Sequence, residues 1–128
     1  MPYLLDTNIA IHLRDRDVPI TLEVGRLEPP LLLSVVSRVE LEGGVYVDPP
    51  KSAVRRLRLA TMLRSLSVLP FNDVSADACR AIVEAAGYSR RKILDRMIAA
   101  QAIVHRATLV TTNGEDFRDV PWLELLEW

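Results

Sequence analysis

The sequence has little of several residues on which many enzymes rely. Cys79 is the only cysteine, so no internal disulfide can form, which is compatible with a reducing cytosol. The two histidines, His12 and His105, are isolated, with no serine, cysteine or second histidine at metal-ligand spacing. Gly43-Gly44 lacks the spacing and the following Lys-Ser/Thr of a phosphate-binding loop. We therefore expect surface or core roles for these residues.

Long apolar runs and excess charge are also absent. No stretch approaches 18 uninterrupted apolar residues, and Asp6 comes too early for the apolar core of a signal peptide. We therefore expect a soluble, cytoplasmic protein with no membrane segment. The formal net charge is −1, so any bound nucleic acid must contact a local basic surface. Only two of the 16 basic residues are lysines. Arginine suits bidentate phosphate contacts, although genomic base composition explains the bias equally well.

The composition that is present suits one packed core. The chain has 128 residues, 49% hydrophobic and 26% charged, and we expect one domain over residues 1–128. Short apolar runs predict strands near residues 3–5, 31–36, 67–69, 108–112 and 123–125. Helical patterns lie near residues 7–14, 37–44, 51–65, 75–86 and 92–105. This alternation predicts an α/β fold, a three-layer α/β/α sandwich around a mostly parallel sheet of about five strands.

Acidic residues follow the strands of this predicted sheet. Asp6 comes directly after the first strand, Glu40 about one helical turn after the second, and Asp116 a few residues after the fourth. Parallel strands bring their carboxyl ends to one edge of a sheet, where ligands bind, so these three side chains should meet there. Asp95 begins the apolar helix before the fourth strand and joins them if that helix starts over the same edge.

Each acid also has a purely structural explanation. Asp6 could cap the first helix, and Glu40 could pair with Ser37 in a capping box. Asp95 could interact with a helix dipole, and Asp116 could be a solvated turn residue. The joint pattern is harder to dismiss. Carboxylates crowded into one crevice repel one another and need a cation, and their hard oxygen atoms suit Mg²⁺ or Mn²⁺.

The segments around these acids form four motifs. They read LLDTN at residues 4–8, SRVEL at 37–41, DRMIAAQA at 95–102 and LVTTNGEDF at 109–117. Each motif alone is weak. Four in this order, at these intervals, resemble the PIN-domain family and, within it, the VapC-like toxin ribonucleases of bacterial toxin–antitoxin pairs. The resemblance covers essentially the whole chain, including the ending from Val120 to Trp128.

This resemblance implies an endoribonuclease that depends on Mg²⁺ or Mn²⁺. It also implies restraint by a cognate antitoxin protein that inserts near the active site, and family members commonly form homodimers. By position in the motifs, Asp6, Glu40 and Asp95 would be the principal catalytic and metal-binding acids. Asp116 would be the fourth and could act through water. The residues expected to support the acids or orient the substrate are Thr7, Thr111 and Asn113.

Two basic segments are candidates for contacting RNA. Arg90, Arg91 and Lys92 stand just before Asp95, where members of the family often carry a less basic stretch. They could tune RNA binding or simply form a solvated helix start. The second candidate is the arginine-rich helix at residues 51–65.

Two other functions stay open on the sequence alone. A PIN-like module could keep the acids for capping and bind RNA or protein without cutting. A phosphohydrolase of the haloacid-dehalogenase type also places an aspartate after its first strand. That family needs a second aspartate two residues later, where this chain has Asn8.

Overall fold

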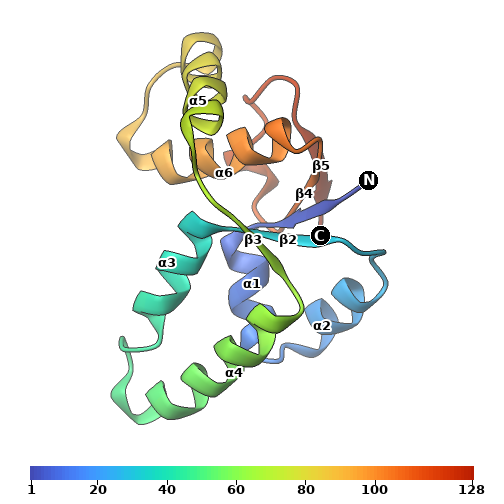
Figure 1. Ribbon diagram of the computed structural model, residues 1–128, viewed down its shortest axis with the longest axis vertical. Helices are drawn as coiled ribbons and strands as arrows, with labels where there is room; N and C mark the ends of the chain where they lie inside the picture. The colour runs from blue at the N-terminus through green and yellow to red at the C-terminus, as the bar shows by residue number, and fades with distance from the viewer.

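The computed structural model describes all residues, 1–128, and has a five-stranded sheet at its centre (Figure 1). The strands are β1 (Tyr3–Leu5), β2 (Leu31–Ser34), β3 (Ser67–Leu69), β4 (Thr108–Thr111) and β5 (Glu124–Glu127). Their order is β3-β2-β1-β4-β5, and every neighbouring pair is parallel. The predicted α/β fold is confirmed, and β1 is its central strand.

Helices cover both faces of the sheet. On one side lie α1 (Thr7–Arg14), α2 (Val18–Gly25), α3 (Val35–Gly44) and α4 (Ser52–Arg64); on the other lie α5 (Asp73–Ala86) and α6 (Ile93–Val104) (Figure 1). Three short 3₁₀ turns complete the chain: η1 (Pro49–Lys51), η2 (Arg90–Lys92) and η3 (Gly114–Asp116). No helix is both long enough and apolar enough to span a bilayer.

The strands are apolar on both faces because both faces are covered. Successive strand residues point to opposite sides of a sheet. Leu4 and Leu109 therefore pack in the core beside α5 and α6, while their neighbours Leu5 and Val110 pack in the core beside α1 and α4. Each fully buried side chain of this size stabilises the fold by about 1.5–3 kcal/mol. This two-sided burial explains why the strands show no polar alternation.

The start of α3 corrects one prediction. The apolar run was expected to stay a strand to Val36, with a capping box at Ser37. Instead β2 ends at Ser34, whose hydroxyl accepts a hydrogen bond from the Val36 N–H (3.0 Å) and caps a helix that begins at Val35. A serine at the end of a strand offers this local cap, and here it outweighs the strand preference of the two valines. Ser37 is thus inside the helix, and no capping box links it to Glu40.

The helices α2 and α4 supply two further corrections. The helix α2 is absent from the predicted elements, because its apolar residues show no clear periodicity. The signals for it in the sequence are Asp17, which caps it, and Pro19 in its first turn. In α4, the spacing of Val54 and Leu57 predicts a core-facing position for both, but they are 48% and 71% exposed. Only the second half of α4, through Leu59 and Met62, reaches the core.

Gln101 joins α6 to the carboxyl ends of β2 and β3. Its side chain is fully buried. The amide nitrogen donates to the carbonyl oxygens of Leu69 (3.2 Å) and Pro70 (3.0 Å), and the amide oxygen accepts a hydrogen bond from the Ser34 hydroxyl. These contacts fix α6 against the edge of the sheet where the predicted acids lie.

Replacing Gln101 with leucine should destabilise the protein by about 1–3 kcal/mol, because three buried polar groups would lose their partner. Urea denaturation of both proteins measures the difference. Glu84→Leu, an exposed change on α5, should alter the free energy of unfolding by no more than about 0.5 kcal/mol. Equal effects of the two substitutions would contradict the structural role of Gln101.

Candidate active site

Asp6 stands at the end of the central strand and is only 4% exposed. Its main-chain N–H donates to the Val110 carbonyl (2.9 Å), which continues the pairing of β1 with β4. One carboxylate oxygen accepts from the Thr7 main-chain N–H (2.8 Å), so Asp6 caps α1. The other accepts from the Thr111 hydroxyl (2.8 Å). Asp6 therefore caps a helix and is also a member of the acid cluster. Hydrogen bonds to both of its carboxylate oxygens hold the side chain in place.

Glu40, on α3, is held through a chain of two hydroxyls. The Thr7 hydroxyl donates to Glu40 Oε1 (2.9 Å) and lies 2.8 Å from the Ser37 hydroxyl oxygen. Because Thr7 gives its single hydroxyl proton to the carboxylate, the Ser37 hydroxyl must donate to Thr7. Ser37 is fully buried, so this chain anchors an exposed carboxylate to the interior. The sequence pattern at residues 37–40 predicts only a cap at Ser37 and does not indicate this role.

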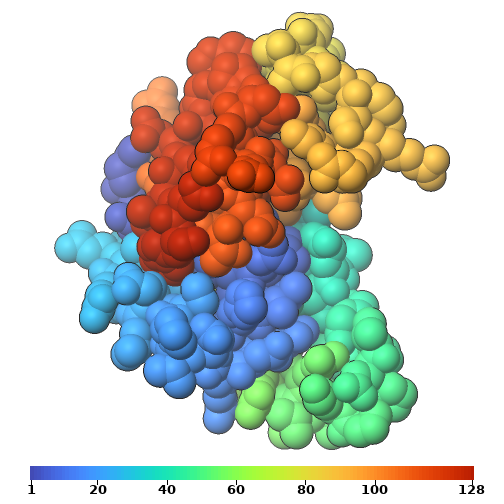
Figure 2. All heavy atoms as spheres, turned by 180° about the vertical axis from the view of Figure 1, so that it is seen from behind, coloured from blue at the N-terminus to red at the C-terminus, as the bar shows by residue number.

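Asp95 and Asp116 approach the same place from the other side of the sheet. Asp95 is half-buried in the first turn of α6, and Asp116 ends η3, just beyond β4. The charges of Asp6, Asp116 and Glu40 all act on Asp95. Figure 2 shows the same meeting of distant segments, with the orange and red C-terminal part lying against the blue N-terminal helices. The structure therefore places the four acids near enough to one another for their charges to act on Asp95.

Two of these carboxyls are unusually difficult to ionise. Burial is the main reason that the pKa of Asp95 rises to about 6, and the charges of Asp6, Asp116 and Glu40 raise it further, against Arg91. Burial also raises the pKa of Asp6, although hydrogen bonds from Thr111 and Thr7 oppose it. Carboxylates placed where their own charges are unfavourable call for a positive counter-charge.

The donor set fits Mg²⁺ or Mn²⁺ rather than a soft metal. It consists of carboxylate oxygens, with no cysteine or histidine among the four acids, and hard cations prefer oxygen ligands. No group of three histidine, cysteine, aspartate or glutamate side chains is placed to hold a metal ion between them. Mg²⁺ does not need such a group, since it binds through one or two carboxylates and fills its octahedron with water and substrate phosphate.

The remaining polar candidates lie around this cluster. Asn113 is exposed, and its main-chain N–H donates to the Thr111 hydroxyl (2.9 Å), the group that also holds Asp6. Arg90 and Arg91 are both exposed on η2, and the positive charge of Arg91 lowers the pKa of Asp95. Lys92 instead pairs with Asp119 (3.4 Å).

Arg96, which sequence analysis missed, ties α6 to the segment after η3. It is almost fully buried and binds both carboxylate oxygens of Asp119 (2.8 and 2.9 Å). The pairing with Arg96 lowers the pKa of Asp119 to about 2. Asp119 follows Asp116 by three residues, and Arg96 follows Asp95 directly, so this ion pair links the two segments that carry site acids. The sequence signal for a buried ion pair at this position is an arginine within an otherwise mostly apolar helix.

In α4, two of the arginines proposed for RNA have partners within the protein. Arg55 donates to the Gly44 carbonyl (2.9 Å). Arg56 binds Glu42 and donates to the Tyr46 hydroxyl (3.0 Å). Both side chains therefore help to hold α4 against the end of α3.

The profile of the PIN domain matches residues 3–123, and the chain belongs to the PIN-domain family. It is 30% identical over 136 residues to Ribonuclease VapC2 of Rickettsia felis, spanning 100% of this chain and 98% of that protein. The expected resemblance to VapC-like toxins is thereby confirmed.

Solved structures agree with this placement. A chain of the VapBC2 complex of Rickettsia felis, bound to a DNA fragment from its promoter, superimposes with a TM-score of 0.86 at 26% identity, covering 100% of this chain and 99% of that one. A chain of FitAcB from Neisseria gonorrhoeae gives 0.80 at 26% identity, covering 98% and 96%. The fold is also that of a chain from DNA-bound VapBC of Salmonella typhimurium, at a TM-score of 0.83, 20% identity and coverage of 100% and 98%.

The raised pKa of Asp95 predicts a pH-dependent gain in stability for Asp95→Asn. The folded protein holds the Asp95 proton more tightly than the unfolded chain, so stability falls as pH rises from the ordinary value of 3.8 to about 6. At pH 7.5, in EDTA, Asp95→Asn should raise the free energy of unfolding by about 1–2 kcal/mol, allowing for solvent screening. At pH 4 most of this gain should vanish.

Urea denaturation of wild type and variant at the two pH values measures the effect. Asp77→Asn, an exposed change on α5, serves as the control and should show no such pH dependence. If Asp95→Asn does not raise the free energy of unfolding at pH 7.5, or raises it equally at both pH values, the ionised Asp95 carboxylate does not destabilise the folded protein.

Proposed function

We propose that this protein is a metal-dependent endoribonuclease, the toxin of a toxin–antitoxin pair, which hydrolyses RNA phosphodiester bonds. The observation that carries the proposal is the meeting of Asp6, Glu40, Asp95 and Asp116 at one edge of the sheet. Membership of the PIN-domain family and the similarity to a protein named Ribonuclease VapC2 support RNA as the substrate.

Asp6 and Asp95 would hold Mg²⁺ or Mn²⁺, with Glu40 and Asp116 acting directly or through water. When bound, such an ion supplies Lewis acidity, which acidifies an attacking water and offsets charge on the phosphate and the leaving oxygen. The protein then needs no histidine base, which suits a chain whose two histidines lie outside the acid cluster.

The side chains around the acids would keep them in place during the reaction. Thr7 and Thr111 occupy both oxygens of Asp6, so that carboxylate cannot rotate freely. Ser37 and Thr7 orient Glu40 in the same way. Asn113 and Arg91 are exposed beside the cluster, where an amide and a guanidinium could contact the RNA backbone.

The partners follow from the relatives. A chain of the VapBC2 complex is similar over the whole of this chain, and VapBC-5 from Mycobacterium tuberculosis is described as a member of the VapBC family of toxin–antitoxin systems. We therefore propose a cognate antitoxin for this chain, together with a homodimeric state and a cytoplasmic location. A PIN-like module that binds without cutting is the alternative, and its acids would serve only as caps.

Asp6→Asn should reduce RNA cleavage in Mg²⁺ or Mn²⁺ by at least about a hundredfold, a loss of roughly 3 kcal/mol or more of transition-state stabilisation. The fold should survive, because asparagine is also a good helix N-cap. Cleavage of a fluorescent RNA and circular dichroism measure the two properties. Asp77→Asn should leave both unchanged. Full activity of a folded Asp6→Asn protein would exclude the proposed site.

Expression without an antitoxin should arrest growth of a bacterial host, because an unrestrained ribonuclease degrades cellular RNA. Induction of wild type is compared with induction of Asp6→Asn at equal protein level, and only wild type should stop growth. If wild-type protein that cleaves RNA in vitro is harmless in cells, the nuclease assignment stands and the toxin role fails.

A further inference from the structure

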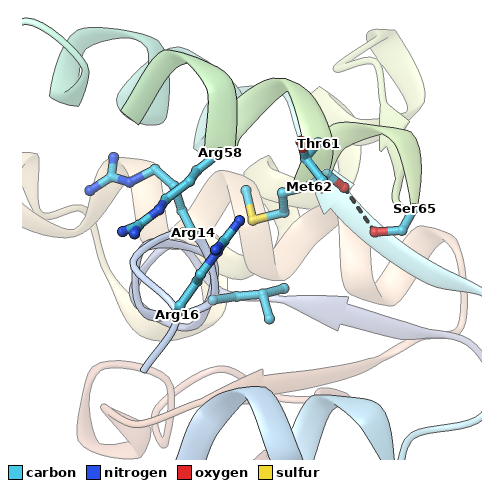
Figure 3. Close-up of a pocket in the computed structure, with 7 residues that line it drawn as sticks. Arg14, Arg16, Arg58, Thr61, Met62 and Ser65 are labelled. Atoms are coloured by element: carbon cyan, nitrogen blue, oxygen red, sulfur yellow. Dashed lines mark hydrogen bonds between the residues drawn. The ribbon is translucent and has the colours of Figure 1, made fainter. Parts of the chain in front are cut away.

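An open cavity lies between the C-terminal end of α1 and the helix α4 (Figure 3). None of the four acids lines it, and its volume is about 170 Å³. Its walls carry three arginines, two hydroxyl side chains and an apolar floor that includes a methionine: Arg14, Arg16, Arg58, Thr61, Ser65 and Met62. The nuclease site proposed above assigns no role to this cavity.

The positive charge in this cavity is not balanced by the protein. Arg14 binds the neighbouring Asp15 through Nε (3.0 Å) and Nη2 (3.3 Å). No carboxylate of the chain forms an ion pair with Arg16 or Arg58. With three arginines and one aspartate, the cavity carries an excess of two positive charges. Like charges gathered in a recess are unfavourable unless an anion joins them.

Arg14 is the most constrained of the three arginines. Its side chain is only 4% exposed, which is rare for a guanidinium, and Asp15 occupies two of its three nitrogen atoms. The third, Nη1, finds no acceptor within the protein. It lies 3.3 Å from the position that a Cβ on Gly44 would take, so the glycine makes room for it. Arg14 is therefore mostly committed to Asp15 and to the space beside Gly44, and the guanidinium groups that are free to bind a ligand in the cavity are those of Arg16 and Arg58.

The position of Arg58 is not explained by a helix dipole. Arg14 stands in the last turn of α1, where the helix dipole favours a cation. Arg58 lies in the middle of α4, where no such effect operates. On the same helix Arg55 and Arg56 are used by internal partners, whereas Arg58 extends into the cavity (Figure 3).

We propose that this cavity binds a phosphate group. The planar fork of arginine matches phosphate oxygens bidentately. An excess of two positive charges suits a phosphate dianion, and it also attracts the singly charged phosphodiester of an RNA backbone. The volume corresponds to roughly five or six waters at about 30 Å³ each, which leaves room for the anion and its hydration. The hydroxyls of Thr61 and Ser65 already donate to main-chain carbonyls of α4, so recognition falls on the guanidinium groups.

The phosphate can come from an RNA backbone or from a free nucleotide or phosphate ion. The helix α1 runs from Asp6, in the acid cluster, to Arg14, in the cavity, a rise of about 12 Å over eight residues. An RNA strand of a few nucleotides is long enough to bridge that separation. The RNA source rests on the proposed function, whereas binding of a free phosphate does not.

The first experiment measures thermal stability in EDTA with potassium phosphate against potassium chloride at equal ionic strength. Phosphate should raise the melting temperature of wild type in a saturable way, since a ligand that binds only the folded state stabilises it. Arg16→Gln and Arg58→Gln should each lose most of this shift. Arg80→Gln removes the same charge from an exposed site on α5 and should retain it.

The second experiment identifies the source with a fluorescent single-stranded RNA, again in EDTA so that cleavage plays no part. For an RNA phosphate, Arg58→Gln should weaken binding about tenfold and lower the salt slope by about one, and free phosphate should compete. Unchanged RNA affinity together with a lost phosphate shift assigns the cavity to a free phosphate or nucleotide.

The proposal is overturned if wild type shows no phosphate-specific shift, or if Arg80→Gln loses as much of it as Arg58→Gln. It is also overturned if Arg16→Gln and Arg58→Gln are folded, keep the phosphate shift and weaken only the binding of a cognate protein partner. None of these readings depends on nuclease activity, so they stand apart from the outcome for the acid cluster.

Discussion

The carboxylate of Asp6 is the contact on which the rest of the structure depends. It ends the central strand, caps the first helix through the Thr7 N–H, and receives the Thr111 hydroxyl from the neighbouring strand. One nearly buried side chain thus fixes β1, α1 and β4 relative to one another. Thr7 extends the same contact to Glu40 and, through Ser37, to the interior of α3. A change at Asp6 therefore acts on the position of at least two carboxylates.

This arrangement keeps negative charge where solvent screens it poorly. Burial raises the pKa of both Asp6 and Asp95, and the surrounding carboxylates add to the effect. Hydrogen bonds from Thr7 and Thr111 stabilise the ionised form of Asp6 and offset part of the cost of burying it, but the pKa of Asp6 is still raised. Such a cluster is intrinsically destabilising, and proteins commonly retain destabilising groups at functional sites. A divalent cation would reduce the repulsion between the carboxylates. Binding of such an ion should therefore also stabilise the folded protein.

The sequence was sufficient for the sheet and for placing Asp6 and Asp116 at one edge of it, because parallel strands share a carboxyl edge and these residues follow two of the strands. It left open whether the helix of Asp95 starts over that edge. It was less informative where local signals compete. Ser34 and Ser37 are both plausible caps, and only the position of the helix start separates them. It pointed to the arginine-rich helix at residues 51–65 but did not separate Arg58 from Arg55 and Arg56, and it did not reveal the ion pair of Arg96, because the partners of these side chains come from segments distant along the chain.

Calorimetric titration with Mn²⁺ near pH 7 tests the central account most directly, because it asks whether the acid cluster is a metal site without requiring a substrate. Wild type and Asp77→Asn should give the same saturable binding, and Asp6→Asn and Asp95→Asn should each weaken it at least about tenfold, or roughly 1.4 kcal/mol. Wild type without saturable binding, or equal affinity in all four proteins, would contradict the account and leave the acids with structural roles alone.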